Sequence, residues 1–70
     1  MPEMIYVDSS NVEAIGYDAD AQELHVQFTS GGTYIYYEVP SGVFDAFMSA
    51  ASKGSFLNRE VKSVYRFAKQ

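Results

Sequence analysis

The sequence contains no cysteine, no tryptophan and a single histidine, His25. Without thiols the chain can form neither a disulfide framework nor a thiolate metal site, and one imidazole is too few for a structural zinc site. His25 lies within a predicted strand and beside no nucleophile-elbow motif, so it does not indicate a Ser-His-Asp triad. We therefore expect no catalytic residues, no metal and no cofactor, and we expect that the protein is not an enzyme.

Long apolar runs are also missing. The longest has four residues, far fewer than a membrane-spanning helix requires. The first residues carry neither the basic segment nor the apolar core of a signal peptide. We expect one cytoplasmic domain over residues 1–70, without a membrane partner. With 47% hydrophobic and 16% aromatic residues, the chain has enough apolar side chains for a core.

Positive charge is absent from the first 52 residues, which contain eight acidic side chains, whereas residues 53–70 contain five bases and one acid. The two parts therefore carry net charges of −8 and +4, which together give the net charge of −4. Such asymmetry is compatible with a surface for nucleic acid or an acidic partner. It is also compatible with a basic helix that packs near acidic loops and neutralises them.

Residues 24–40 carry the densest aromatic and β-branched content of the chain, which is typical of a β-hairpin. Apolar and polar side chains alternate from Leu24 to Thr29, and this period indicates a strand with one buried and one solvated face. The turn-forming segment Ser30–Gly32 follows. A second strand then runs from residue 33 to Pro40, which cannot donate a ladder hydrogen bond.

The loop length decides which hairpin side chains are buried, because a one-residue slip moves every side chain to the other face. A three-residue loop, Ser30–Gly32, is a common hairpin closure and places Tyr36 opposite Val26 on the core face. It leaves Ile35 and Tyr37 on the open face. A loop of two or four residues would exchange the faces. We favour the three-residue loop, which makes Ile35 and Tyr37 a candidate interaction surface.

An upstream strand over residues 12–17 completes a meander, and residues 4–7 are a candidate edge strand. After the hairpin, apolar residues recur at helical spacing over residues 43–51, and Gly54 is expected to end this helix. A second apolar stripe over residues 57–68 predicts a last helix. The fold class is therefore α+β: a three-stranded antiparallel meander, with or without an added N-terminal edge strand. Two C-terminal helices cover one face of this sheet.

The last predicted helix carries basic side chains on the face opposite its apolar stripe. With one base just before this helix they form our candidate nucleic-acid-binding set: Lys53, Arg59, Lys62, Arg66 and Lys69. Lys and Arg are the side chains that neutralise phosphates. The alternative interpretation is the solvated face of an ordinary amphipathic helix.

Three groups of residues are together typical of one family. They are Val7–Val12 with Ile15–Asp18, then Tyr34-x-Tyr36 with Val39-Pro40, and then Ser52-x-Gly54-x-Phe56-x-Asn58. In these features, over residues 5–67, the chain resembles the KTSC domain. That short domain occurs as a stand-alone bacterial protein and at the C-terminus of some lysyl-tRNA synthetases. The synthetase context implies RNA or tRNA as a partner. The hairpin strands here carry no basic residue, so RNA contacts would depend on the last helix.

The resemblance also directs attention to four small polar residues: Ser9, Ser10, Ser52 and Asn58. They are candidates for a polar pocket at the sheet–helix edge, or for helix caps and turns. The sequence thus predicts a small non-enzymatic module that binds RNA through a basic C-terminal helix. The alternative is a protein-interaction or oligomerisation module, which would bind another protein or a second copy through the sheet face around Ile35 and Tyr37.

Overall fold

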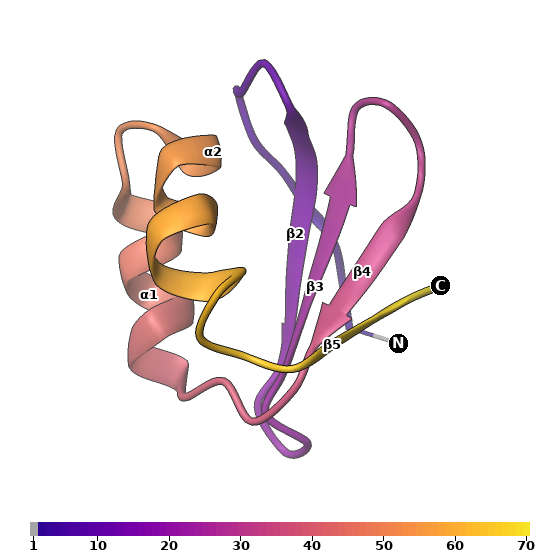
Figure 1. Cartoon of the computed structure of the whole chain (residues 1–70), viewed down its shortest axis with the longest axis vertical. Coiled ribbons are helices and arrows are strands. Elements are labelled where there is room, and N and C mark those ends of the chain that lie inside the picture. The colour runs from indigo at the N-terminus through magenta and orange to yellow at the C-terminus, as the bar shows by residue number, and fades with distance from the viewer. Residues whose placement is uncertain (1) are drawn as a thin grey trace.

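The computed structural model describes residues 2–70, which form one antiparallel sheet with helices on one of its faces (Figure 1). The sheet has five strands in chain order: β1 (Ile5–Tyr6), β2 (Val12–Asp18), β3 (Glu23–Phe28), β4 (Thr33–Tyr36) and β5 (Phe67–Lys69). Each strand pairs with the strands next to it in the sequence, and all pairs are antiparallel. The α+β class and the N-terminal edge strand are confirmed, but the sheet has a fifth strand that the sequence pattern did not predict.

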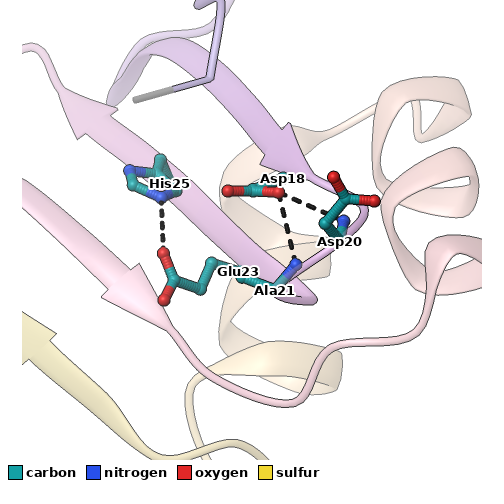
Figure 2. A network of polar contacts seen from close by, with 5 residues as sticks. All are labelled: Asp18, Asp20, Ala21, Glu23 and His25. Atoms are coloured by element: carbon teal, nitrogen blue, oxygen red, sulfur yellow. Dashed lines mark hydrogen bonds and ion pairs between the residues drawn. The ribbon is translucent and has the colours of Figure 1, made fainter.

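The turn between β2 and β3 is built by Asp18. Its Oδ1 atom accepts hydrogen bonds from the backbone amides of Asp20 (3.1 Å) and Ala21 (3.3 Å), as Figure 2 shows. A carboxylate that caps its own turn in this way is a common device in short connections. Gln22 completes the reversal in a left-handed conformation, with φ of 56°.

The β3–β4 hairpin differs from the expected register by two residues. Tyr34, not Tyr36, lies opposite Val26. The loop has three residues as predicted, but they are 29–31: the amide of Phe28 donates to the carbonyl of Gly32 (3.1 Å), and the amide of Gly31 donates to the carbonyl of Phe28 (3.0 Å). Because a shift by two residues preserves the faces, Tyr34 and Tyr36 still share the core face with Val26.

The helices α1 (Ser41–Ser49), α2 (Lys53–Phe56) and η1 (Leu57–Val61, a π-helix) cover one face of the sheet (Figure 1). Fully buried side chains of the strands, the helices and the β4–α1 connection form the core beneath them: Val12, Ile15, Leu24, Val26, Tyr36, Val39, Phe47, Leu57 and Val61. Gly54 was expected to end the first helix, but this prediction is wrong, because Gly54 lies inside α2. A Cβ atom on Gly54 would lie 2.5 Å from Oδ1 of Asn11, so the helix can approach the β1–β2 loop only without a side chain there.

The predicted last helix is wrong beyond Val61. The amide of Lys62 donates to the carbonyl of Leu57 (2.8 Å), which closes the π turn. A turn follows, in which the amides of Val64 (3.1 Å) and Tyr65 (3.0 Å) donate to the carbonyl of Val61, and the chain then extends into β5. Val64, which the helical stripe would bury, is exposed. The physical reason is the free edge of β4: strand pairing satisfies its backbone groups, whereas a helix would leave them unpaired.

The opposite face of the sheet is partly covered by the N-terminal segment. A Cβ atom on Gly16 would lie 2.6 Å from Sδ of Met4 and 3.0 Å from the carbonyl oxygen of Glu3, so Gly16 permits this close approach. Beside it, His25 is only 4% exposed, and its Nε2 atom lies 3.3 Å from Oε1 of Glu23 (Figure 2). Over residues 2–70, no helix combines the length and apolar character needed to span a bilayer.

Candidate functional site

A groove of about 400 Å³ opens beside the β3–β4 loop, on the helix-covered side of the sheet. It is lined by aromatic residues of three strands, by two residues of the loop and by two lysines: Phe28, Ser30, Gly31, Tyr34, Tyr36, Lys62, Phe67 and Lys69. The lysines come from the end of η1 and from β5, so the fifth strand supplies one wall. No acidic residue among those that the structure describes lines this groove.

The aromatic rings of the groove support one another. The Phe67 ring packs with both tyrosines, with centroid distances of 5.6 Å to Tyr34 and 5.6 Å to Tyr36, and Phe28 meets Tyr34 edge-on at 5.4 Å. Tyr36 is 1% exposed, whereas Phe67 is 49% exposed. Phe67 therefore offers an exposed aromatic surface on a fixed base, which is the geometry that stacking with a planar ligand requires.

The groove is lined by two positive charges although the net charge of the protein is −4. Nζ of Lys69 lies 6.0 Å from the ring centroid of Tyr34. Lys69 lies opposite Tyr34, which lies opposite Val26, and Val26 is three residues, or about 10 Å along a strand, from Glu23 at the start of β3. Because the Debye length is about 8 Å at physiological ionic strength, the acids of the β2–β3 turn are partly screened from Lys69.

The structure divides the five basic residues of the candidate set. Only Lys62 and Lys69 meet in the groove. Nζ of Lys53 donates a hydrogen bond to the carbonyl of Ala50 (2.6 Å) at the end of α1, which is a capping role. The Arg66 guanidinium lies 5.5 Å from the ring centroid of Tyr37 and 3.6 Å from a carboxylate oxygen of Glu38. Arg59 is exposed on η1 and lies outside the groove.

The candidate interaction surface of Ile35 and Tyr37 lies on the face opposite the groove. Both residues are half-buried rather than open. Ile35 sits between His25 of β3 and Ala68 of β5, and Tyr37 is covered by Arg66. The most exposed aromatic residue in the described range is instead Tyr6 in edge strand β1, at 72%.

Of the four small polar residues, Ser9 and Ser52 act through their side chains, in a turn and in a helix cap. Oγ of Ser9 donates to Oδ1 of Asn11 (3.1 Å), and the carbonyl of Ser10 accepts from the Thr29 hydroxyl (3.2 Å). Oγ of Ser52 accepts from the amide of Ser55 (3.3 Å) and caps α2. Asn58 is exposed on η1. None of the four lines the groove.

A second hollow, of about 300 Å³, lies at the acidic end of the sheet. Its walls are formed by the N-terminal segment and the end of β2: Pro2, Glu3, Tyr17, Asp18, Ala19 and Asp20. The carboxylate of Asp18 is already used by the turn. Within residues 2–70, no group of three or more His, Asp or Glu side chains is arranged to hold a metal ion.

The aromatic part of the groove was missed because the sequence pattern assigned Tyr34 and Tyr36 to the core and Phe67 to a helix. A signal did exist: Phe67 and Lys69 flank Ala68 in an alternating pattern at the end of the chain. Three residues of alternation are too few to decide against a helical stripe that precedes them.

Comparison with known proteins shows the family. The model of the KTSC domain matches residues 8–65, so the chain belongs to the KTSC domain family. A crystal structure of a KTSC domain protein from Yersinia pestis is 38% identical, has a TM-score of 0.96, and covers 100% of this chain and 99% of its own.

Two relatives by sequence illustrate the range of the family. A protein from Tsukamurella paurometabola is 52% identical over 60 residues, which are 86% of this chain and 90% of that protein. A lysine–tRNA ligase of Nostoc punctiforme is 32% identical over 60 residues, which are 86% of this chain but 11% of the ligase. The match therefore concerns only a small part of the ligase.

Proposed function

We propose that this domain is a small cytoplasmic, non-enzymatic module that binds single-stranded RNA in the groove of Lys62, Phe67 and Lys69. The observation that carries the proposal is the exposed Phe67 ring in a groove that Lys62 and Lys69 also line, and in which none of the described residues 2–70 contributes an acidic side chain. Single-stranded nucleic acids are bound by such combinations, in which bases stack on aromatic rings and lysines track the phosphates.

The likeness to part of a lysine–tRNA ligase supports RNA over other polyanions. The name of that ligase gives tRNA as its substrate, and a domain of the same family can share a ligand of this kind. This support is an analogy, because a shared fold does not fix a shared function.

The site size predicts weak binding. Two phosphate contacts give a salt slope of roughly −1.4 for a single strand, and stacking contributes about 1–3 kcal/mol per base. The proposed contacts are thus fewer than those of a domain-wide basic surface. A modest affinity of this kind suits an accessory module that adds to the binding of another site.

The test is a titration of labelled single-stranded RNA with the protein and three single variants, followed by fluorescence anisotropy at several salt concentrations. Lys62→Glu and Lys69→Glu should each weaken binding and reduce the salt slope by about 0.7. Arg59→Glu is the matched control, since it makes the same change of charge outside the groove and should alter binding much less. Equal effects of all three variants, or no binding by the parent protein, would refute the proposal.

A second candidate, an interaction or oligomerisation module, is favoured by the exposed edge strand β1, where Ile5 is 44% and Tyr6 72% exposed. The expected surface of Ile35 and Tyr37 adds little to it, because both are half-buried. Sedimentation of the protein and of Tyr6→Ser would test self-association. A monomer over the accessible concentration range would remove a second copy as the partner.

A further inference from the structure

The groove is small and one-sided. A volume of about 400 Å³ lies near the lower end of the range of small-molecule pockets, so it fits one compact planar group with its substituents. The Phe67 ring is packed against Tyr34 and Tyr36 and can therefore take a ligand only on its remaining exposed surface. One ring with one free surface can stack one base, and the other aromatic residues of the groove are half-buried (Phe28 and Tyr34) or buried (Tyr36).

Tyr36 adds a polar group to the floor of this groove. Its ring is buried, yet the residue lines the groove. Within residues 2–70, its hydroxyl takes part in none of the side-chain hydrogen bonds, whereas the hydroxyl of the comparable Tyr17 donates to the carbonyl of Val39. The phenol of Tyr36 can both donate and accept a hydrogen bond, and leaving it unpaired under a ligand costs free energy.

Burial, together with the neighbouring Tyr34, raises the pKa of Tyr36 above its ordinary value of 10.0. The hydroxyl therefore remains protonated at neutral pH and keeps both its donor and its acceptor capacity. A neutral donor is also compatible with an anionic ligand, which a phenolate would repel.

We propose, on the basis of the RNA-binding function above, that the groove is a subsite for one nucleotide, in which the base stacks on Phe67, the Tyr36 hydroxyl hydrogen-bonds the nucleotide, and Lys62 and Lys69 hold its phosphate. The subsite makes Tyr36 a specificity-determining residue, because a hydroxyl on the floor distinguishes nucleotides by the hydrogen-bonding groups that they present. The recognised chemistry is a planar heteroaromatic base with a phosphate, whether it belongs to a strand or to a free nucleotide.

The test is an amide-shift NMR titration of the full chain with the four ribonucleoside 5′-monophosphates, with a short single-stranded RNA, and with inorganic phosphate, all at low salt. The monophosphates should shift Lys62, the β5 residues and Tyr36, and they should differ from one another in affinity. Inorganic phosphate should shift only the surroundings of the lysines, because it cannot stack.

The variant Tyr36→Phe keeps the buried ring and removes the oxygen. It should weaken the preferred nucleotide about two- to tenfold, as expected for one hydrogen bond, and reduce the differences among the four. Tyr17→Phe is the matched control, since it removes a phenol oxygen outside the groove and should leave the ranking unchanged. Retained shift dispersion shows that each variant is folded.

The outcomes separate the two proposals. If RNA binds but monophosphates do not bind at millimolar concentration, or if Tyr36→Phe leaves the ranking unchanged, the single-nucleotide subsite is wrong and RNA binding stands. If monophosphates bind and RNA does not, the subsite stands as a site for free nucleotides and the RNA-binding function is wrong. If neither binds, both are overturned.

Discussion

The backbone amide of Tyr37 donates a hydrogen bond of 2.8 Å to the carbonyl of Arg66, the residue that directly precedes β5. The Arg66 guanidinium lies over the ring of the same tyrosine, 5.5 Å from its centroid. The hydrogen bond starts the pairing of β5 with β4, which continues to the bond from the amide of Gln70 to the carbonyl of Thr33 (2.8 Å). The last four residues are thereby held on the sheet, where Phe67 and Lys69 form the groove.

The first prediction concerns this pairing. Ala68 lies opposite Ile35 in the middle of β5, so Ala68→Pro removes an amide from the ladder and should release the strand. Hydrogen exchange should then accelerate in β4 and at residues 67–70, and nucleotide-dependent shifts in the groove should disappear. Ala68→Ser is the control, because this exposed position accepts a small side chain. Unchanged protection of β4 in Ala68→Pro would contradict the role assigned to β5.

The second prediction concerns Gly54, where the helical position and the tertiary contact have opposite effects. In an open helix, alanine is more stable than glycine by about 1 kcal/mol. Here the new Cβ atom would lie 2.5 Å from Oδ1 of Asn11, so Gly54→Ala should destabilise the fold. In an Asn11→Ala background that obstacle is gone, and the same substitution should become neutral or stabilising. Urea unfolding of the four proteins of this cycle measures the sign, and additive effects would show that the two residues do not interact.

The features of the fold that could be predicted from the sequence are those that depend on local interactions. The period of two in the hairpin determined its faces, and these survived a register shift of two residues. The register depended on Gly31 and Gly32, which both adopt positive φ (92° and 99°) and permit more than one loop. The buried pair Leu57 and Val61 was read correctly as one helical face. The residues after Val61 were not, because the free edge of β4 overrode their helical pattern.

The sequence predicted the lysines of the candidate site but not the groove in which they meet. Lys62 and Lys69 could be selected from charge alone, but their meeting in one groove requires the extended conformation of β5. The contacts of Lys53 and Arg66 involve residues outside the predicted last helix. Lys53 binds the carbonyl of Ala50, and Arg66 lies over the ring of Tyr37. Local periodicity contains no information on such contacts.

The third prediction concerns Gln22, which closes the β2–β3 turn with φ of 56°. A side chain in the left-handed region has a steric cost that glycine avoids, although glycine loses more backbone entropy on folding. Gln22→Gly should therefore raise the free energy of unfolding by about 0.5–1 kcal/mol, measured by urea denaturation. Gln22→Ala retains the unfavourable φ and should give no such gain. Equal effects of the two variants would show that backbone conformation is not the cause.

The last prediction concerns the alkaline stability of the fold. Burial raises the pKa of Tyr17 above its ordinary value of 10.0, and the carboxylates of Asp18 and Asp45 add to this effect. Because the folded pKa exceeds the unfolded one, the protonated phenol contributes stability that is complete below the unfolded pKa and is lost as the pH rises through the folded pKa. The free energy of unfolding should thus decline above about pH 10.

The variant Tyr17→Phe separates this effect from the other tyrosines. It removes the hydrogen bond to the carbonyl of Val39 and should lower the free energy of unfolding at neutral pH by about 1 kcal/mol. The free energy of unfolding of this variant should decline less steeply at alkaline pH than that of the parent, because the raised pKa of Tyr17 is gone. A decline remains, because burial and Tyr34 also raise the pKa of Tyr36. Denaturant unfolding at neutral pH and at several pH values above 10 measures both quantities. Parallel declines in the two proteins would mean that the Tyr17 phenol ionises in the folded state as readily as in the unfolded chain.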